Sequence, residues 1–167
     1  MIIREATVED ARAIALVHVT AWQTAYRGLM PDAVLDQLSV DERTARWVRI
    51  LSTAETSHTL VAEQDDGILG WVSIGPGRDE GRAHEGEVWA IHVDPNSFSQ
   101  GVGRALMHAA EETLRGMGFT HAFLWVLEGN ERATAFYERN GWLPDGETKI
   151  DQRPEMVLAE HRRVKRI

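Results

Sequence analysis

A glycine-containing turn joins an apolar strand to an amphipathic helix between Ile91 and Leu106. The strand is predicted to end at Val93, and the helix is predicted to begin at Gly101. The first four amides of a helix have no carbonyl partner, and the helix dipole adds partial positive charge there. Glycine allows a ligand to come close to those amides. The segment therefore predicts a phosphate site and requires a fold that places a helix start beside a strand end.

The composition is that of one ordinary globular domain, which we expect to span residues 1–167. A net charge of −8 argues against nucleic acid as a partner, because binding to a phosphate backbone needs clustered lysine and arginine. The sequence has no cysteine, which excludes disulfides, thiolate metal sites and a cysteine nucleophile. Its seven histidines show no H-x-x-x-H or H-E-x-x-H spacing, so we expect no metal.

The N-terminal residues lack the basic region, apolar stretch and small-residue cleavage site of a secretion signal. No later window comes close to about 18 apolar residues, the length that a membrane helix requires. We therefore expect a cytoplasmic protein without a membrane partner.

The order of apolar patterns predicts a mixed α/β or α+β sheet with helices on its faces. Residues 65–67 are predicted to form a turn between two strands, and the basic residues 161–167 could equally be disordered. Strands are predicted over 2–6, 59–63, 68–74, 87–93, 121–127 and 156–159, and helices over 11–25, 31–38, 41–51, 101–117 and 130–140.

Two common phosphate motifs do not fit the turn. A P-loop needs a lysine after its second glycine, and the only lysines in the chain are Lys149 and Lys165. The dinucleotide fingerprint needs a third glycine and an acidic residue about 20 positions later. Leu106 stands near the place of that glycine, and residues 121–125 contain no carboxylate. Another class of phosphate ligand is therefore indicated.

The turn resembles the signature [QR]-x-x-G-x-[GA] of the GNAT acyltransferase superfamily, which binds the pyrophosphate of acetyl-CoA. Phe98 stands where the superfamily usually has a basic or amide residue, while Gln100-x-x-Gly103-x-Ala105 satisfies the pattern two residues further on. Residues 87–95 and 124–142 are also similar to superfamily sequences in type, order and separation.

The resemblance implies an α+β (mixed α/β) fold, with a mostly antiparallel, twisted central sheet whose central strands splay apart and whose faces carry helices. It also implies acetyl-CoA as co-substrate. Main-chain groups of Ile91 and Val93 would receive the pantetheine arm, and His92 alternates with them on the strand. The residues expected to bind the cofactor are Ile91, His92, Val93, Gln100, Gly101, Val102, Gly103, Arg104, Ala105 and Asn130.

The resemblance further implies that Glu87 is the general base and that Tyr137 protonates the departing sulfur. A solvated strand-edge glutamate and a buried packing tyrosine are the alternatives, and Glu85 and Glu128 are substitutes for the base. Asn130 and Tyr137 are seven residues apart, close to two helical turns, and therefore share a face. As a helix cap, Asn130 needs no ligand.

Trp22 and Tyr26 lie four residues apart on the first helix and are candidates for binding the acceptor, although an aromatic stripe at this spacing is more often core. His92 is a weaker candidate as an auxiliary acid or base beside the acceptor cleft. The reaction expected is direct acetyl transfer to a primary amine, carried by a small molecule or a peptide, in a ternary complex. A non-catalytic CoA-binding module is the alternative function, and a homodimer is left open.

Overall fold

The computed structural model describes residues 1–65 and 67–167, and these form one seven-stranded sheet with helices on both faces. The strand order is β1-β2-β3-β4-β5-β7-β6. The predicted turn at residues 65–67 includes Asp66, which lies outside the described residues. The strands are β1 (Ile2–Glu5), β2 (His58–Gln64), β3 (Gly67–Pro76), β4 (Gly86–Val93), β5 (His121–Leu127), β6 (Leu143–Arg153) and β7 (Met156–Arg166). The helices are α1 (Ala11–Ala25), α2 (Asp32–Asp36), α3 (Val40–Thr53), α4 (Val102–Gly116) and α5 (Glu131–Arg139), with short 3₁₀ turns at Val8–Asp10 and Pro95–Ser97.

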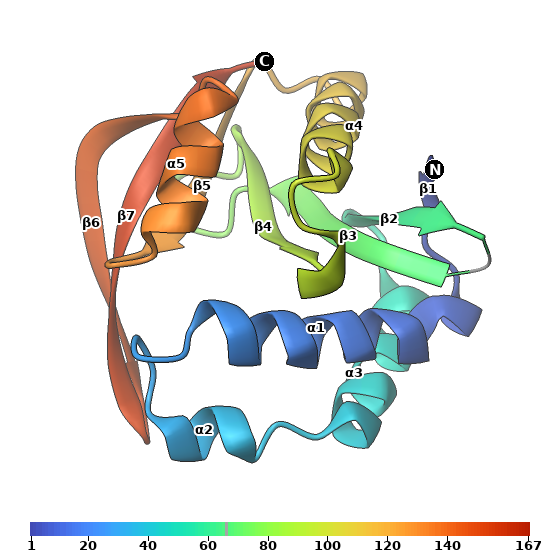
Figure 1. The fold of residues 1–167 in the computed structure, drawn as a ribbon. Helices are drawn as coiled ribbons and strands as arrows, with labels where there is room; N and C mark the ends of the chain where they lie inside the picture. Colours follow the sequence, from blue (N-terminus) through green and yellow to red (C-terminus); the bar gives the residue numbers. More distant parts are fainter. Residues whose placement is uncertain (66) are drawn as a thin grey trace.

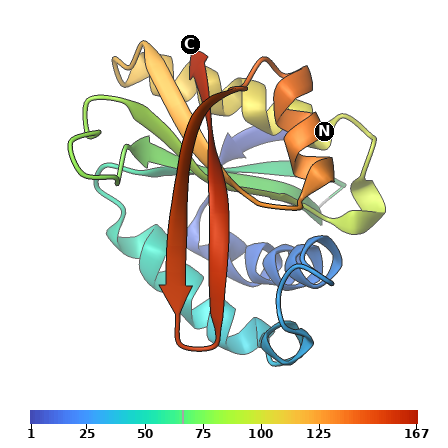
Figure 2. The same ribbon diagram turned by 90° about the vertical axis from the view of Figure 1, so that its left-hand side faces the viewer.

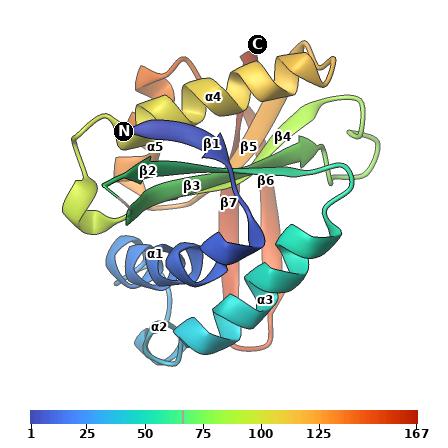
Figure 3. The same cartoon turned by 90° about the vertical axis from the view of Figure 1, so that its right-hand side faces the viewer.

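The helices form two layers, with α1, α2 and α3 on one face of the sheet and α4 and α5 on the other (Figure 1). On the α4 side, Leu106, Leu114 and Val72 belong to one buried apolar cluster. On the α1 side, where α1 and α3 lie against the sheet (Figure 3), Ile14, Trp47 and Trp71 belong to a second buried cluster. Because both sheet faces are covered, the central strands are apolar on both sides, and the expected helix-flanked fold is confirmed.

Strands β4 and β5 are parallel, and they pair over two residues only. Gly86 lies opposite Ala122 and Glu87 lies opposite Phe123, after which the two strands have no further paired residues in the described chain. On its other edge, β4 stays paired with β3 as far as Val93. The remaining described neighbours in the sheet are antiparallel, so the expected mostly antiparallel sheet with splayed central strands is confirmed.

The C-terminal residues correct one expectation. Of residues 161–167, which could equally have been disordered, 161–166 belong to β7, an eleven-residue strand between β5 and β6. The basic side chains have acidic partners: Arg162 Nη2 lies 2.6 Å from Asp145 Oδ2, and Lys165 Nζ lies 2.7 Å from Glu111 Oε1. These basic residues can therefore lie in a strand, because carboxylates from distant positions in the sequence compensate their positive charges.

Strand β6 was not predicted, because its sequence is largely polar and its side chains are mostly exposed at the edge of the sheet. It forms a long hairpin with β7 that extends past the sheet towards α2 (Figure 2). Leu158 of β7 is buried there with Met30 and Leu35. The hairpin therefore forms one wall of the space that opens between β4 and β5.

Candidate active-site cleft

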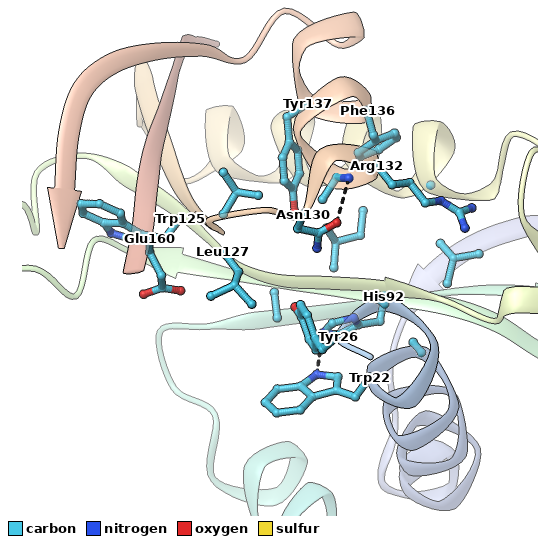
Figure 4. Close-up of a pocket in the computed structure, with 18 of the residues that line it drawn as sticks. Trp22, Tyr26, His92, Trp125, Leu127, Asn130, Arg132, Phe136, Tyr137 and Glu160 are labelled. Carbon is cyan, nitrogen blue, oxygen red and sulfur yellow. Dashed lines mark hydrogen bonds between the residues drawn. The ribbon is translucent and has the colours of Figure 1, made fainter. Parts of the chain in front are cut away.

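The divergence of β4 and β5 opens a cleft with a volume of about 1720 Å³. Its walls come from α1, β4, the turn before α4, β5, α5, β6 and β7 (Figure 4). A cleft of this size takes a ligand larger than a typical drug-sized molecule. The backbone edge of β4 beyond Glu87 faces this space without a partner strand in the described chain.

The turn between β4 and α4 presents backbone amides at one end of the cleft. The Asp94 side chain accepts a hydrogen bond from the N–H of Asn96 at 2.9 Å, and Ser99 has a φ of +63°. Gly101 is the N-cap of α4 with a φ of +84°, a conformation that glycine adopts without strain. The first amides of α4 are therefore free to bind an anion, as the sequence predicts.

Some of the predicted cofactor-binding residues of this turn line the cleft, and others do not. Gly101, Val102, Gly103 and Arg104 line the cleft in the described structure, whereas Gln100 and Ala105 are not among its lining residues. Gln100 instead donates a hydrogen bond to the Asn96 carbonyl oxygen at 3.0 Å. A Cβ atom on Gly103 would lie 3.3 Å from Cε2 of Phe136, so the close packing of α4 on α5 favours glycine there.

Sequence reasoning missed a cation at this end of the cleft. The guanidinium carbon of Arg132, in the first turn of α5, lies 3.2 Å from the centre of the Phe98 ring. Both residues line the cleft. An arginine stacked on an aromatic ring keeps its outer N–H groups available for a phosphate. Phe98, which departs from the signature that the turn resembles, therefore supports the positive charge of Arg132 from α5.

Strand β4 directs alternate side chains to opposite sides, as the sequence predicts. Ile91 and Val93 pack against the apolar cluster of α4, and His92 lies on the α1 side. Trp22 Nε1 donates a hydrogen bond to His92 Nε2 at 3.1 Å. Burial, followed by the positive charge of Arg43, lowers the pKa of His92 to about 4. The ring is therefore neutral at pH 7, and this nitrogen is already an acceptor.

The aromatic residues of α1 form one wall of the cleft. The rings of Trp22 and Tyr26 meet edge to face with centres 5.2 Å apart, and both residues line the cleft. Both also pack against the apolar cluster around Leu35, as the core interpretation predicts, and their role in binding the acceptor stays a prediction. Burial, followed by the negative charge of Glu160, raises the pKa of Tyr26 to about 12.

Asn130 and Tyr137 reach the cleft from α5, as their spacing predicts (Figure 4). Oδ1 of Asn130 accepts a hydrogen bond from the N–H of Ala133 at 3.1 Å, which confirms the predicted helix cap. Its amide N–H groups remain available for a ligand. Tyr137 is buried, and this burial, followed by the influence of Tyr26, raises the pKa of its hydroxyl. Tyr137 therefore holds its proton at neutral pH and can donate it to an anion.

Glu87 lines the cleft, but its carboxylate already accepts hydrogen bonds from Arg78. Its side chain is only 2% exposed, and Arg78 Nη2 lies 2.7 Å from its Oε1. The backbone N–H of Arg78 donates to its Oε2 at 2.8 Å. Both oxygens thus already accept charge-assisted hydrogen bonds. Of the two substitutes, Glu85 pairs with Arg82 at 2.8 Å, and Glu128 has a side chain that is 66% exposed.

A further carboxylate in the cleft was not predicted. Glu160 lies on β7, opposite Leu127 of β5 and Lys149 of β6 in the strand registers, and it lines the cleft. Burial raises the pKa of its carboxyl group, and Lys149 opposes this effect. The sequence carried no signal for Glu160, because residues 156–159 were expected to be the whole of the last strand.

Two further expectations concern metals and membranes. Among residues 1–65 and 67–167, no three His, Asp or Glu side chains are grouped so that they could hold a metal ion. In the same part of the chain, no helix is both long enough and apolar enough to cross a bilayer.

Comparison with known proteins gives concordant matches. The sequence model of the Acetyltransferase (GNAT) family matches residues 19–142. The uncharacterised N-acetyltransferase YuaI of Bacillus subtilis is 35% identical over 137 residues, which cover 81% of this chain and 76% of YuaI.

Two solved structures have the same fold. The PaiA N-acetyltransferase from Thermoplasma acidophilum, in complex with coenzyme A, superposes with a TM-score of 0.73 at 18% identity, over 99% of this chain and 98% of PaiA. YncA from Salmonella typhimurium, solved with its cofactor acetyl-CoA, gives a TM-score of 0.73 at 19% identity, over 99% of this chain and 93% of YncA.

Proposed function

Because the chain belongs to the Acetyltransferase (GNAT) family, we propose that it moves an acetyl group from acetyl-CoA to a primary amine. The observation that carries the proposal is the cleft itself, which joins the anion-binding turn to the buried hydroxyl of Tyr137. The solved structures of PaiA with coenzyme A and of YncA with acetyl-CoA, which share this fold, support the choice of donor.

The donor's pyrophosphate would bind the amides at the start of α4, next to Gly101. The Arg132 guanidinium on Phe98 supplies the positive charge beside that turn. The free edge of β4 around Ile91 and Val93 offers backbone groups to the amides of the pantetheine arm, as an added strand would. The N–H groups of Asn130 complete this path towards Tyr137.

Acetyl transfer then needs one bond to form and one to break. The lone pair of the neutral amine attacks the thioester carbonyl carbon, forming the C–N bond, and the C–S bond breaks. The departing sulfur takes the proton of the Tyr137 hydroxyl, whose raised pKa keeps that proton in place until a thiolate develops. The chain has no cysteine to carry the acetyl group, so transfer occurs directly in a ternary complex.

An amine that enters as an ammonium ion must lose one proton before it attacks, and the nitrogen loses a second proton once the C–N bond has formed; this second proton restores the Tyr137 hydroxyl. Glu87 is the base expected from the resemblance, and it would act through a water molecule, because Arg78 occupies both of its oxygens. This role for Glu87 stays a prediction. Its test is Glu87→Gln, which should lower kcat if the base is Glu87 and leave it unchanged if the base lies elsewhere.

The first experiment measures thiol release from acetyl-CoA over a panel of primary amines, with coenzyme A binding followed by calorimetry. Tyr137→Phe should lower kcat by about 10²-fold, the effect expected for loss of a general acid, with the Kd for coenzyme A unchanged. Saturable coenzyme A binding without thiol release from any amine would favour the non-catalytic module. An unchanged kcat in Tyr137→Phe would remove Tyr137 from the mechanism.

A further inference from the structure

We propose that Glu160 binds the ammonium group of the acceptor and takes its proton. The proposal rests on the acetyltransferase function above and deepens it, because it names the acceptor class and assigns the first deprotonation of the ammonium group to Glu160 in place of Glu87. The acceptor would be a primary alkylammonium whose carbon chain is apolar or aromatic. The proton passes from the ammonium nitrogen to a carboxylate oxygen of Glu160, and the nitrogen keeps the electron pair with which it attacks the thioester.

Position is the first support for this role. The Glu160 side chain is 22% exposed, and the residue lines the cleft. Figure 4 shows the Glu160 carboxylate and the Tyr26 ring on either side of Leu127 in the cleft. The effect of Glu160 on the pKa of Tyr26 agrees with this arrangement, since a phenolate there would be repelled by the carboxylate. The carboxylate therefore lies on the acceptor side, across from the aromatic wall.

Availability is the second support. The nearest described cation, Lys149 Nζ, lies 3.6 Å from Glu160 Oε2, and Asp79 shares that lysine at 3.8 Å. Lys149 is the only cationic side chain in the described part of the chain within 4.0 Å of the Glu160 carboxylate, and its contact is a long one. Glu87, in contrast, accepts from Arg78 at 2.7 Å and 2.8 Å. Of Glu87 and Glu160, Glu160 is therefore the one that can accept a new N–H donor.

The aromatic rings are the third support. Lys149 Nζ lies 4.4 Å from the centre of the Trp125 ring, so a primary ammonium already lies against an aromatic face at this end of the cleft. Tyr26 and Trp22 present further aromatic surface on the opposite wall. A carboxylate with aromatic walls is the chemistry that recognises an alkylammonium. Leu127 between them suits an apolar carbon chain.

Electrostatics fit the proton transfer. Burial raises the pKa of Glu160 above its ordinary 4.5; Lys149 and Arg153 of β6 oppose the shift, and Asp151 adds to it. Tyr26 faces it from α1 as a neutral hydroxyl. A carboxyl with a raised pKa is a stronger base, and it must be ionised to act. The acid limb of kcat/KM should therefore lie above pH 4.5 and belong to this residue.

The binding test uses 2-phenylethylamine and its neutral analogue 2-phenylethanol, titrated into the enzyme–coenzyme A complex. The wild type should bind the amine at least about tenfold more tightly than the alcohol, and Glu160→Gln should abolish this difference. Glu160→Asp, which keeps the charge, should restore part of it. Glu147→Gln on β6 makes the same charge change at an exposed position outside the cleft lining and should match the wild type.

Turnover separates the two proposals. If thiol release from acetyl-CoA occurs, Glu160→Gln should lower kcat/KM for the amine by about 10²-fold and remove the acid limb of its pH profile. Equal binding of amine and alcohol by the wild type, or an unchanged pH profile in Glu160→Gln, would overturn the role of Glu160. If no amine gives thiol release from acetyl-CoA, the proposed function is overturned instead, and the binding test still decides the ammonium site.

Discussion

The imidazole of His18 lies in α1 with neither ring nitrogen bonded to a described residue. The residue is 8% exposed, and its ring packs against Trp22, Trp71 and His92 at centre distances of 5.2, 5.4 and 5.5 Å. Burial, followed by the influence of His92 and Arg43, lowers its pKa to about 2. His18 therefore behaves as a neutral aromatic residue that supports the wall of the cleft formed by α1.

This burial predicts a loss of stability in acid. The unfolded chain binds a proton on each histidine as the pH falls below 6.5, and the folded chain does not until about 4 at His92 and about 2 at His18. The stabilisation is therefore complete above pH 6.5 and is lost as the pH falls below it. Between pH 7.5 and 6.0, the free energy of unfolding of His18→Phe should fall by about 1 kcal/mol less than that of the wild type.

Urea unfolding at the two pH values measures this difference. His84→Gln is the matched control, because the His84 side chain is 75% exposed, and it should lose stability between the two pH values as the wild type does. An equal loss in His18→Phe and the wild type would show that His18 is protonated in the folded protein.

At the scale of elements, the turn before α4 and the first turn of α5 act as a pair. Phe98 gives Arg132 an aromatic surface, and Arg132 gives the turn its cation. Arg132→Ala should weaken coenzyme A binding by about tenfold, the size of one charged hydrogen bond. Phe98→Gln in the same variant should restore part of the affinity, because an amide at that position can itself donate to a phosphate.

Calorimetry with coenzyme A measures both variants. Arg49→Ala on α3 removes the same charge from an exposed helix on the other face of the sheet and should leave the Kd unchanged. An equal Kd for Arg132→Ala and the wild type would mean that the guanidinium only packs on Phe98.

Elements with strong local signals were predicted closely from the sequence. Strand β5 has the expected bounds, His121–Leu127, and α5 lies between Asn130 and Gly141 as expected. Strand β6 and most of β7 were missed, because their polar residues are explained only by partners far away in the chain, such as Glu111 for Lys165. The same reason hid Arg132 and Glu160, whose positions depend on contacts between elements. The glycine turn was found because its geometry is local.

At the scale of the whole molecule, one buried ionic network joins three parts of the fold. Lys165 of β7 donates to Oε1 of Glu111 on α4 at 2.7 Å and to the carbonyl oxygen of Asn140 at 2.8 Å. Trp142 Nε1 donates to the same Glu111 oxygen at 3.0 Å. Glu111 is 5% exposed, so its charge depends on these partners. The network fixes α5 and the C-terminal strand against α4, and so fixes the upper wall of the cleft.

Breaking this network on one side should destabilise the protein. Lys165→Met leaves the Glu111 carboxylate buried without its closest cation and should lower the free energy of unfolding by about 3 kcal/mol. The double variant Glu111→Gln/Lys165→Met should lose less, because no unpaired charge remains and the new side-chain amide would still accept from Trp142. Urea unfolding of the two variants measures the difference. Equal losses would mean that packing, and not charge, is what Lys165 contributes.

The free edge of β4 has a consequence for self-association. Exposed strand edges attract strands of other chains and lead to aggregation, and proteins usually cover such edges or place charges on them. Here the edge lies inside a cleft between α1 on one side and α5 on the other. The β-sheet of a second molecule is too wide to pair with this edge, whereas a single extended ligand can lie along it. The same two helices thus prevent edge-to-edge pairing between two copies of the protein, while a narrow, extended ligand can still bind the edge.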